Sequence, residues 1–383
     1  MSVEIVLPPD GVLLHIGPPK TGTTAIQRAM FARRDELAGL GIRCAGDGPH
    51  PREAVAAGVG KEHRSGLRPS EDAWAALVAE VKACPQLVFV SSEGFADATP
   101  EAIRRCVKEL GGDRVHVVIT ARPLAAMLPS AWQQYVRNGL LLGYDEWLQA
   151  MLGDNPKPRV TASFWYRHRY DHLVARWGEV VGADRIRFAP VGGVDRLALP
   201  RAFEEILGLP DGFLELQPSA DNRSLTFGEA ELVRRLNREF KDRGWYDAHY
   251  NALIRRGAVE RMRLSRAPAD DELRITTPRW ALDAAAVRAA EIVRGVAAAG
   301  VPVLGDLETL AADADRASVR DADGGAPSTV AIDAAVEALI GALSGDGFEA
   351  TDEAAIGRRL SSVRATDIVK ALGRRAVRRL SPP

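Results

Sequence analysis

Residues 13–24 read LLHIGPPKTGTT, and this stretch decides which fold the chain adopts. An apolar run typical of a buried strand passes through a Gly/Pro turn into a segment with helical spacing of its apolar residues. A loop between a strand and a helix collects the unpaired N–H groups and the positive end of that helix at one point, where anions bind. Lys20 adds a cation to this point, and the neighbouring threonine hydroxyls add hydrogen-bond donors.

Further short apolar runs, each bounded by polar or glycine residues, follow the first one along the chain. With it they predict strands at Val12–Ile16, Leu87–Val90, Val115–Ile119 and Ile186–Phe188. Helical patterns lie between the strands: Thr23–Leu40 ends at Gly41, and helices start at Thr99-Pro100 and Arg122-Pro123. Strands that alternate with helices indicate a central parallel sheet flanked by helices, which is a three-layer α/β fold.

From Gly143 onward the sequence is mainly helical. It contains an aromatic-rich stretch that we interpret as a helix packed on the sheet: Phe164, Trp165, Tyr166, Tyr170 and Trp177. Residues 316–328 are polar and rich in Gly, Asp and Ser, which is typical of a linker. These features predict one α/β domain over residues 1–313, a linker over 314–328 and a helical, Ala-rich basic tail over 329–383. We expect the tail to be a solvated helix end rather than a contact for membranes or nucleic acid.

The 50 Lys and Arg residues balance 51 Asp and Glu residues, so the 383-residue chain has a formal net charge of −1. No global field then attracts nucleic acid or an anionic membrane, and any bound anion needs a local site. Cys44, Cys84 and Cys106 form no C-x-x-C pair, which favours a reducing compartment. The first residues lack the pattern of a signal peptide, and no apolar run reaches the length of a membrane span. We therefore expect a cytoplasmic protein without a transmembrane segment.

The loop has the glycine spacing of a Walker A motif, G-x-x-x-x-G-K-[ST], but Thr23 occupies the lysine position. The lysine stands before the second glycine instead, at position 20. The string PKTGTT is similar to the 5′-phosphosulfate loop of sulfotransferases that use 3′-phosphoadenosine 5′-phosphosulfate (PAPS). Over roughly residues 11–240, this resemblance implies a P-loop-like α/β fold and PAPS as the donor. A sulfuryl group carries less negative charge than a phosphoryl group, so we expect that no metal ion is required. The resemblance assigns these residues to the 5′-phosphosulfate: Lys20, Thr21, Gly22, Thr23 and Thr24.

A second element follows the strand Val115–Ile119, which leads to Arg122, with Ser130 eight positions later on a predicted helix. A cation at a helix N-terminus opposes the helix dipole, so it is tolerated more readily beside a bound anion. The pair resembles the element with which these sulfotransferases bind the 3′-phosphate of PAPS. The alternative is a surface arginine paired with a carboxylate, and a serine bonded within its own helix.

A third and weaker signal is Arg223, which lies in the polar segment before the predicted helix Thr226–Phe240. Many members of the family close over the nucleotide with a late basic loop, and the resemblance gives Arg223 this role. The alternative is a plain helix N-cap at Ser224 or Thr226.

Glu93 follows the strand Leu87–Val90 and is expected at the same edge of the sheet as the phosphate loop. In the family a histidine or a glutamate stands here, so Glu93 resembles a general base that takes the proton of the attacking acceptor. The alternatives are a structural Glu93 that caps a helix or pairs with a lysine, or a base at His50 or His63.

The sequence therefore predicts a sulfotransferase that moves a sulfuryl group from PAPS to a hydroxyl or amine of a carbohydrate, lipid or small molecule. Lys20 would stabilise charge on the departing bridging oxygen, and no nucleic-acid partner is expected. The alternative functions are a P-loop kinase or nucleotide hydrolase that uses ATP and Mg²⁺, and a non-catalytic nucleotide-binding protein. His168 and His172 have the i, i+4 spacing of a metal pair, but we expect ordinary helix histidines because the pattern lacks a glutamate.

Overall fold

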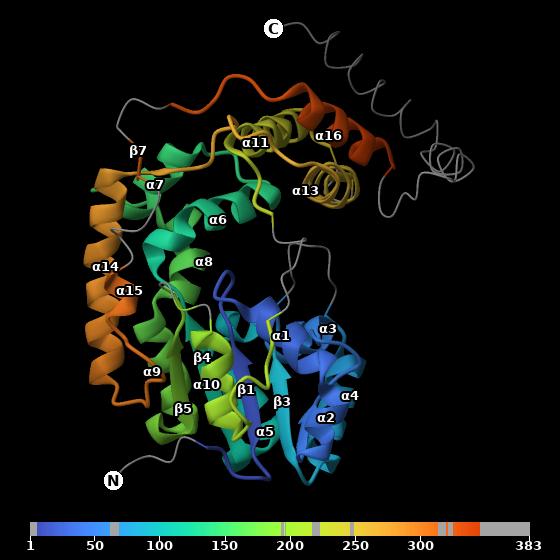
Figure 1. The fold of residues 1–383 in the computed structure, drawn as a ribbon, viewed down its shortest axis with the longest axis vertical. Coiled ribbons are helices and arrows are strands. Elements are labelled where there is room, and N and C mark those ends of the chain that lie inside the picture. The colour runs from blue at the N-terminus through green and yellow to red at the C-terminus, as the bar shows by residue number, and fades with distance from the viewer. Residues whose placement is uncertain are drawn as a thin grey trace, which may run out of the picture.

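The structure is a computed structural model, and it describes residues 6–61, 69–192, 195, 197–216, 223–245, 249–312, 319–320 and 325–344. A five-stranded parallel sheet forms its centre, in the order β2-β3-β1-β4-β5 (Figure 1). The strands are β1 (Val12–Ile16), β2 (Ile42–Cys44), β3 (Leu87–Ser91), β4 (Val115–Ala121) and β5 (Ile186–Pro190). The four predicted strands are confirmed. The strand β2 has no counterpart among them, because 3 residues are too few to show a periodic pattern.

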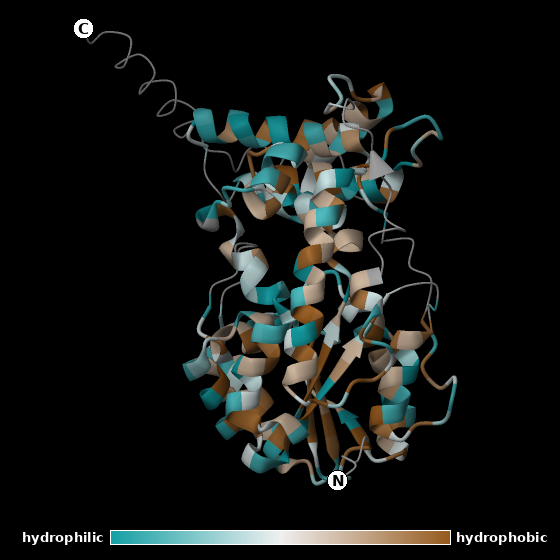
Figure 2. Ribbon diagram, turned by 90° about the vertical axis from the view of Figure 1, so that its left-hand side faces the viewer, coloured by the Kyte–Doolittle hydropathy of each residue, from teal (hydrophilic) through white to brown (hydrophobic). Residues whose placement is uncertain are grey.

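Apolar side chains cover both faces of the sheet. Along β1, Val12, Leu14 and Ile16 belong to one hydrophobic cluster, whereas Leu13 belongs to the other. The first cluster also takes residues from α4 (Glu71–Ala83), α5 (Pro100–Leu110) and α9 (Tyr170–Val181). The second takes residues from α1 (Thr23–Ala32), α2 (Arg34–Gly39) and α10 (Ala198–Leu207). Helices therefore cover both faces, which confirms the three-layer α/β fold; Figure 2 shows the hydrophobic strands enclosed by helices with hydrophilic outer faces.

Local capping signals set several helix boundaries. The Thr99 hydroxyl accepts the N–H of Ala102 at 3.3 Å and caps α5, as the sequence predicts. Thr226 begins α11 (Phe227–Asp242) with a capping box that Glu229 completes. The predicted helix Thr23–Leu40 is instead the pair α1 and α2, because Arg33 has φ −110° and ψ 20° and interrupts the helical backbone.

The other regular elements lie around this frame. The α-helices are α3 (Arg52–Gly58), α6 (Leu124–Arg137), α7 (Tyr144–Leu152), α8 (Pro158–His168), α13 (Val259–Ser265), α14 (Arg279–Ala298), α15 (Thr309–Ala312) and α16 (Ile332–Ser344). The tighter 3-10 turns are η1 (Glu93–Asp97), η2 (Gly112–Arg114) and η3 (Ala183–Arg185), and η5 (Tyr250–Ala258) is a π-helix. A second small sheet pairs β6 (Thr277–Pro278) with β7 (Val319–Arg320).

A helical layer that includes α6, α11, α13 and α16 lies beyond the carboxyl ends of the strands (Figure 1). Helix α16, from the predicted tail, packs on η5 and α13, where Arg261 Nε lies 2.7 Å from a Glu337 carboxylate oxygen. The backbones approach closely at this contact, because a Cβ on Gly257 would lie 2.4 Å from the carbonyl oxygen of Gly341. Most of the predicted linker and the tail beyond Ser344 lie outside the described residues. Within the described part of the chain, every helix is too short or too polar to span a bilayer.

Candidate functional site

Three neighbouring strands deliver the predicted site residues to one edge of the sheet. The strand β1 pairs with β3 through His15 and Ser91, and with β4 through Ile16 and Ile119. The loop after β1, the turn η1 after β3 and the Arg122 segment after β4 therefore leave the sheet side by side. The strands β2 and β3 lie on one side of β1, and β4 and β5 lie on the other, so the strand order reverses at β1. Open α/β sheets bind ligands at the carboxyl edge beside such a switch point.

The phosphate loop closes tightly on itself. Thr23 Oγ1 donates a hydrogen bond to the carbonyl oxygen of Gly17 at 3.0 Å, and a Cβ on Gly17 would lie 2.1 Å from that hydroxyl. Gly22 has φ +86°, and Lys20 has φ +76°, which makes it the one non-glycine residue with positive φ in the described part of the chain. A left-handed conformation costs a non-glycine residue free energy, so this lysine is held in place by its surroundings.

The start of α1 is suited to bind an anion. Its first turn contains Thr23 and Thr24 and carries no acidic residue, so no side chain of that turn neutralises the positive helix end. The N–H groups of a first turn have no partner within their own helix. In α1 the N–H of Ala25 donates to the carbonyl oxygen of Gly22 at 3.0 Å, so the groups available to phosphate or sulfate oxygens are the N–H groups of Thr23 and Thr24. Thr24 is half-buried, and its hydroxyl makes no hydrogen bond with a described residue.

Thr21, in contrast, is turned into the interior. Its buried hydroxyl donates to the carbonyl oxygen of Pro18 at 2.8 Å and lies 2.9 Å from Thr120 Oγ1 on β4. It therefore ties the loop to the sheet from inside, which differs from the predicted contact with the nucleotide. The sequence pattern does not show this, because the direction of one loop side chain depends on the neighbouring strand.

Beneath the loop lies a buried polar network that the sequence analysis did not identify. His15 Nε2 lies 3.2 Å from Thr120 Oγ1, and its Nδ1 lies 2.8 Å from Ser91 Oγ, which also accepts a hydrogen bond from Gln27 at 2.9 Å. Burial lowers the pKa of His15 to about 3, so the ring is neutral near pH 7. The network joins the ends of β1, β3 and β4, and a histidine inside an apolar strand was its sequence signal.

Lys20 lies among like charges. Burial lowers the pKa of Lys20, and the guanidinium groups of Arg137, Arg263 and Arg122 lower it further, whereas Glu93 raises it. Among the described residues, its ammonium has no hydrogen-bond or ion-pair partner. A lysine that is strained, desolvated and surrounded by cations is arranged to receive a negatively charged ligand.

Glu93 opens η1, which follows β3, and lies near Lys20 and two arginines. Burial raises the pKa of Glu93, while Arg52, Lys20 and Arg167 oppose this rise. Its carboxylate makes no hydrogen bond with a described residue. A carboxylate with a raised pKa and free oxygens has the properties that a general base needs. Glu93 also lies at the same edge of the sheet as Lys20, as the strand positions in the sequence predict.

Two arginines of the helical layer join this site without any motif in the sequence. Arg137, at the end of α6, and Arg263, on α13, both bind the carboxylate of Glu260; Arg263 Nη1 does so at 2.7 Å. Two guanidinium groups thus share one acid, and Arg137 Nε is buried without a hydrogen-bond partner. Together with Lys20 and Arg122, they bring four cations close to one another beside the carboxylates of Glu93 and Glu260, although the whole chain has almost no net charge.

The second predicted element consists of Arg122, directly after β4, and Ser130, which lies on α6. The backbone of Arg122 is fixed by Tyr170, and its guanidinium makes no hydrogen bond with a described residue. The Ser130 hydroxyl donates to the carbonyl oxygen of Met127 at 3.0 Å within α6. It must rotate away from Met127 before it can donate to a phosphate, so its predicted role stays a prediction.

Arg223 lies in the helical layer beside Arg263, whose Nε donates to the carbonyl oxygen of Arg223 at 3.1 Å. Its five N–H donors are all used, by both carboxylate oxygens of Glu229 and by the carbonyl oxygens of Arg263, Ser224 and Met262. Glu229 is fully buried and also binds Arg266, so these residues form a structural ion-pair network. The guanidinium has no donor left for a phosphate unless some of these bonds open, so the predicted nucleotide contact stays a prediction. The N-cap at Thr226, which the sequence offered as the alternative, is present in the structure.

The histidines considered as bases or metal ligands lie in different parts of the structure. His50 is half-buried, and burial, followed by Arg52 and Arg28, lowers its pKa to about 4, whereas His63 lies outside the described residues. His168 is buried against the phosphate loop, but His172 is exposed beside Asp171. The two therefore do not face one ligand, and no cluster of three or more metal-ligating side chains occurs among the described residues.

No protein-family model and no curated protein sequence matches the chain. Among solved structures, it is similar to a sulfotransferase from Alicyclobacillus acidocaldarius, with 17% sequence identity over 59% of this chain and 90% of that one. The TM-score of this superposition is 0.39, and a similarity of this degree carries no argument about function. The function is therefore inferred from the site.

Proposed function

We propose that the protein is a sulfotransferase that transfers a sulfuryl group from PAPS to a hydroxyl or amine. One observation carries this proposal: the loop that leads into α1, a carboxylate with a raised pKa, and a lysine and an arginine that have no partner among the described residues follow three adjacent strands at one edge of the sheet. PAPS has a 5′-phosphosulfate and a 3′-phosphate, so it needs two anion sites. Lys20 with the start of α1 fits the first of these groups, and Arg122 fits the second.

The proposed reaction is an in-line transfer. The N–H groups of Thr23 and Thr24 hold the 5′-phosphosulfate, and Lys20 stabilises charge on the oxygen that bridges phosphorus and sulfur. Glu93 accepts the proton of the acceptor group. The bond from the acceptor to sulfur forms as the bond from sulfur to the bridging oxygen breaks, and 3′-phosphoadenosine 5′-phosphate (PAP) leaves.

The electrostatics of the site favour this reaction over ATP chemistry. In P-loop kinases and hydrolases, a carboxylate beside the loop helps to hold Mg²⁺. Here the equivalent carboxylate, Glu93, already faces Lys20, Arg52 and Arg167, and a divalent cation at this position would be repelled by them. Thr23 also occupies the Walker lysine position, and its hydroxyl is bonded to Gly17.

Calorimetric titration and thermal shift with PAP, AMP, ATP and ATP–Mg²⁺ test the proposal. PAP should bind and stabilise the protein without metal, because ligand binding to the native state raises its stability. Two charge-assisted hydrogen bonds to the 3′-phosphate would make PAP bind at least about a hundredfold more tightly than AMP. Stabilisation by ATP–Mg²⁺ but not by PAP would show that the protein is a P-loop kinase or hydrolase instead.

The variant Arg122→Ala separates the two anion sites. It should weaken PAP and remove most of its preference over AMP, while AMP affinity changes little because the 5′ loop is intact. Ser130→Ala should show the same pattern to a smaller extent. If Arg122→Ala lowers the affinities for PAP and AMP equally, this arginine supports the fold or the 5′ site and does not bind the 3′-phosphate.

A further inference from the structure

Residues 166–170, YRHRY, join the end of α8 to the start of α9, and we call them the brace. They form part of the aromatic-rich stretch that the sequence indicated only as a packed helix. In the structure, successive side chains of the brace reach the three loops that leave β3, β1 and β4. A single short segment thus contacts the three loops that carry Glu93, Lys20 and Arg122.

The first contact of the brace is with η1, which begins at Glu93. Arg167 forms a two-point ion pair with Asp97, with Nε 2.8 Å and Nη2 2.6 Å from the two carboxylate oxygens. The Tyr166 hydroxyl donates to the carbonyl oxygen of Ala98 at 2.9 Å. Asp97 lies at the other end of the same short 3-10 turn as Glu93, so these bonds fix the turn that carries the carboxylate.

The second contact is with the phosphate loop. His168 is buried, and its Nε2 lies 3.1 Å from the carbonyl oxygen of Pro19, the residue before the strained Lys20. Its Nδ1 lies 2.9 Å from the carbonyl oxygen of Phe164. Burial lowers the pKa of His168 to about 4, so near pH 7 the ring is neutral and has one N–H to donate. Both neighbouring atoms are carbonyl oxygens, which only accept, so the contact with the phosphate loop requires this proton to be on Nε2.

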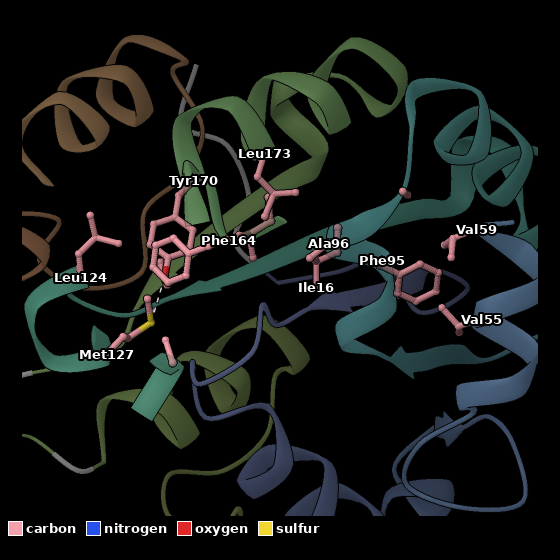
Figure 3. Close-up of a cluster of buried hydrophobic side chains, with 14 of the residues drawn as sticks. Ile16, Val55, Val59, Phe95, Ala96, Leu124, Met127, Phe164, Tyr170 and Leu173 are labelled. Atoms are coloured by element: carbon pink, nitrogen blue, oxygen red, sulfur yellow. Dashed lines mark hydrogen bonds between the residues drawn. The ribbon is translucent and has the colours of Figure 1, made fainter. Parts of the chain in front are cut away.

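The third contact is with the segment after β4. The Tyr170 hydroxyl donates to the carbonyl oxygen of Arg122 at 3.1 Å and accepts the N–H of the same residue at 3.2 Å. Burial raises the pKa of Tyr170, so the hydroxyl keeps its proton and can make both bonds. Figure 3 shows the Tyr170 side chain directed toward Met127, whose sulfur lies 3.7 Å from the hydroxyl.

We propose that His168 and Tyr170 are positioning residues for the two ends of the nucleotide. His168 fixes the conformation of the loop that holds the 5′ end, and Tyr170 fixes the position of Arg122, which holds the 3′-phosphate. This inference rests on the proposed function. Apolar side chains of α8 and α9, such as Phe164, Leu173 and Trp177, pack in the hydrophobic core. The polar tips of His168 and Tyr170 point instead at backbone atoms of the two loops.

The test compares PAP and AMP binding by calorimetry in the full-length protein. Tyr170→Phe keeps the ring and removes only the hydroxyl, so PAP should weaken about tenfold while AMP affinity stays the same. His168→Leu should weaken PAP and AMP alike by about tenfold. His168→Gln should restore much of this loss, because its amide N–H reaches the position of Nε2. His172→Ala, an exposed change on the first turn of α9, is the matched control and should leave both affinities unchanged.

The outcomes separate the two proposals. If the unaltered protein binds no PAP, the proposed function is wrong, and the proposed roles of His168 and Tyr170 are wrong as well. If it binds PAP in preference to AMP, but Tyr170→Phe changes both affinities equally or neither, only the brace inference is overturned. Melting temperatures measured in parallel identify any variant that is simply unfolded. For Tyr170→Phe, a purely structural role would lower the melting temperature without changing the ratio of PAP to AMP affinity. For His168→Leu, the proposal requires both affinities to fall at an unchanged melting temperature and to be restored by His168→Gln, and unchanged affinities would overturn the role of His168.

Discussion

Thr23 Oγ1 and the carbonyl oxygen of Gly17 lie 3.0 Å apart, so a side chain at the start of α1 closes the loop that begins at the end of β1. This bond leaves no space for a side chain at position 17, where a Cβ would lie 2.1 Å from the hydroxyl. The loop curvature, and with it the direction of the first-turn N–H groups, depends on this contact.

Gly17→Ala should therefore displace Thr23 and abolish tight PAP binding. Forcing a methyl group into a packed site costs about 1–3 kcal/mol, which chemical denaturation should detect. Gly39→Ala is the matched control, because a Cβ there would have no atom within 4 Å. An unchanged PAP affinity in Gly17→Ala would mean that the nucleotide does not use this loop.

The strained backbone of Lys20 should lower the free energy of unfolding of the protein. Lys20→Ala and Lys20→Gly both remove a half-buried cation from a group of cations, and both should lower turnover by about two powers of ten or more. Only glycine also relieves the backbone, whose φ is +76°. Lys20→Gly should thus be more stable than Lys20→Ala by about 1 kcal/mol in chemical denaturation. Equal stability of the two variants would show that the loop relaxes to another conformation.

Glu93 should make stability and activity depend on pH in opposite directions. Burial raises its pKa in the native state above the ordinary carboxyl value, so stability is lost as the pH rises through the raised pKa. Glu93→Gln should be more stable than the unaltered protein above that pH, and the difference should vanish below the ordinary carboxyl pKa. Denaturation curves measured across this pH range test the sign.

The same variant tests the role of Glu93 as the base. Turnover should fall by about two powers of ten, and the acid limb of the profile of kcat/KM against pH should disappear. Affinity for PAP should remain close to normal. Full turnover by Glu93→Gln would move the base to another group, with His50 and His63 as the next candidates.

Arg223→Ala should be a stability variant and not a binding variant. Its guanidinium holds Glu229, which is fully buried, by charge-assisted hydrogen bonds whose loss costs about 1–3 kcal/mol. The preference for PAP over AMP should not change. A loss of that preference in a protein of normal stability would restore Arg223 to the nucleotide site.

The chain sequence by itself determined the elements whose signals are local. The apolar run before Gly17, the turn glycines and the caps at Thr99 and Thr226 each act within a few residues, so their pattern predicts strand, loop and helix starts directly. Parallel strands share one carboxyl edge, and for this reason Glu93 and Arg122 could be assigned to the edge that also carries the phosphate loop.

Only the tertiary structure decided which polar groups meet at that edge. The side chain of Thr21 turns inward because Thr120 on β4 offers it a partner, and Arg223 is occupied because Glu229 is buried beside it. The contacts of His168 with Pro19 and of Tyr170 with Arg122 join residues 149 and 48 positions apart. Such contacts depend on how helices pack over the sheet, and this packing is fixed by the whole apolar core and not by any local pattern.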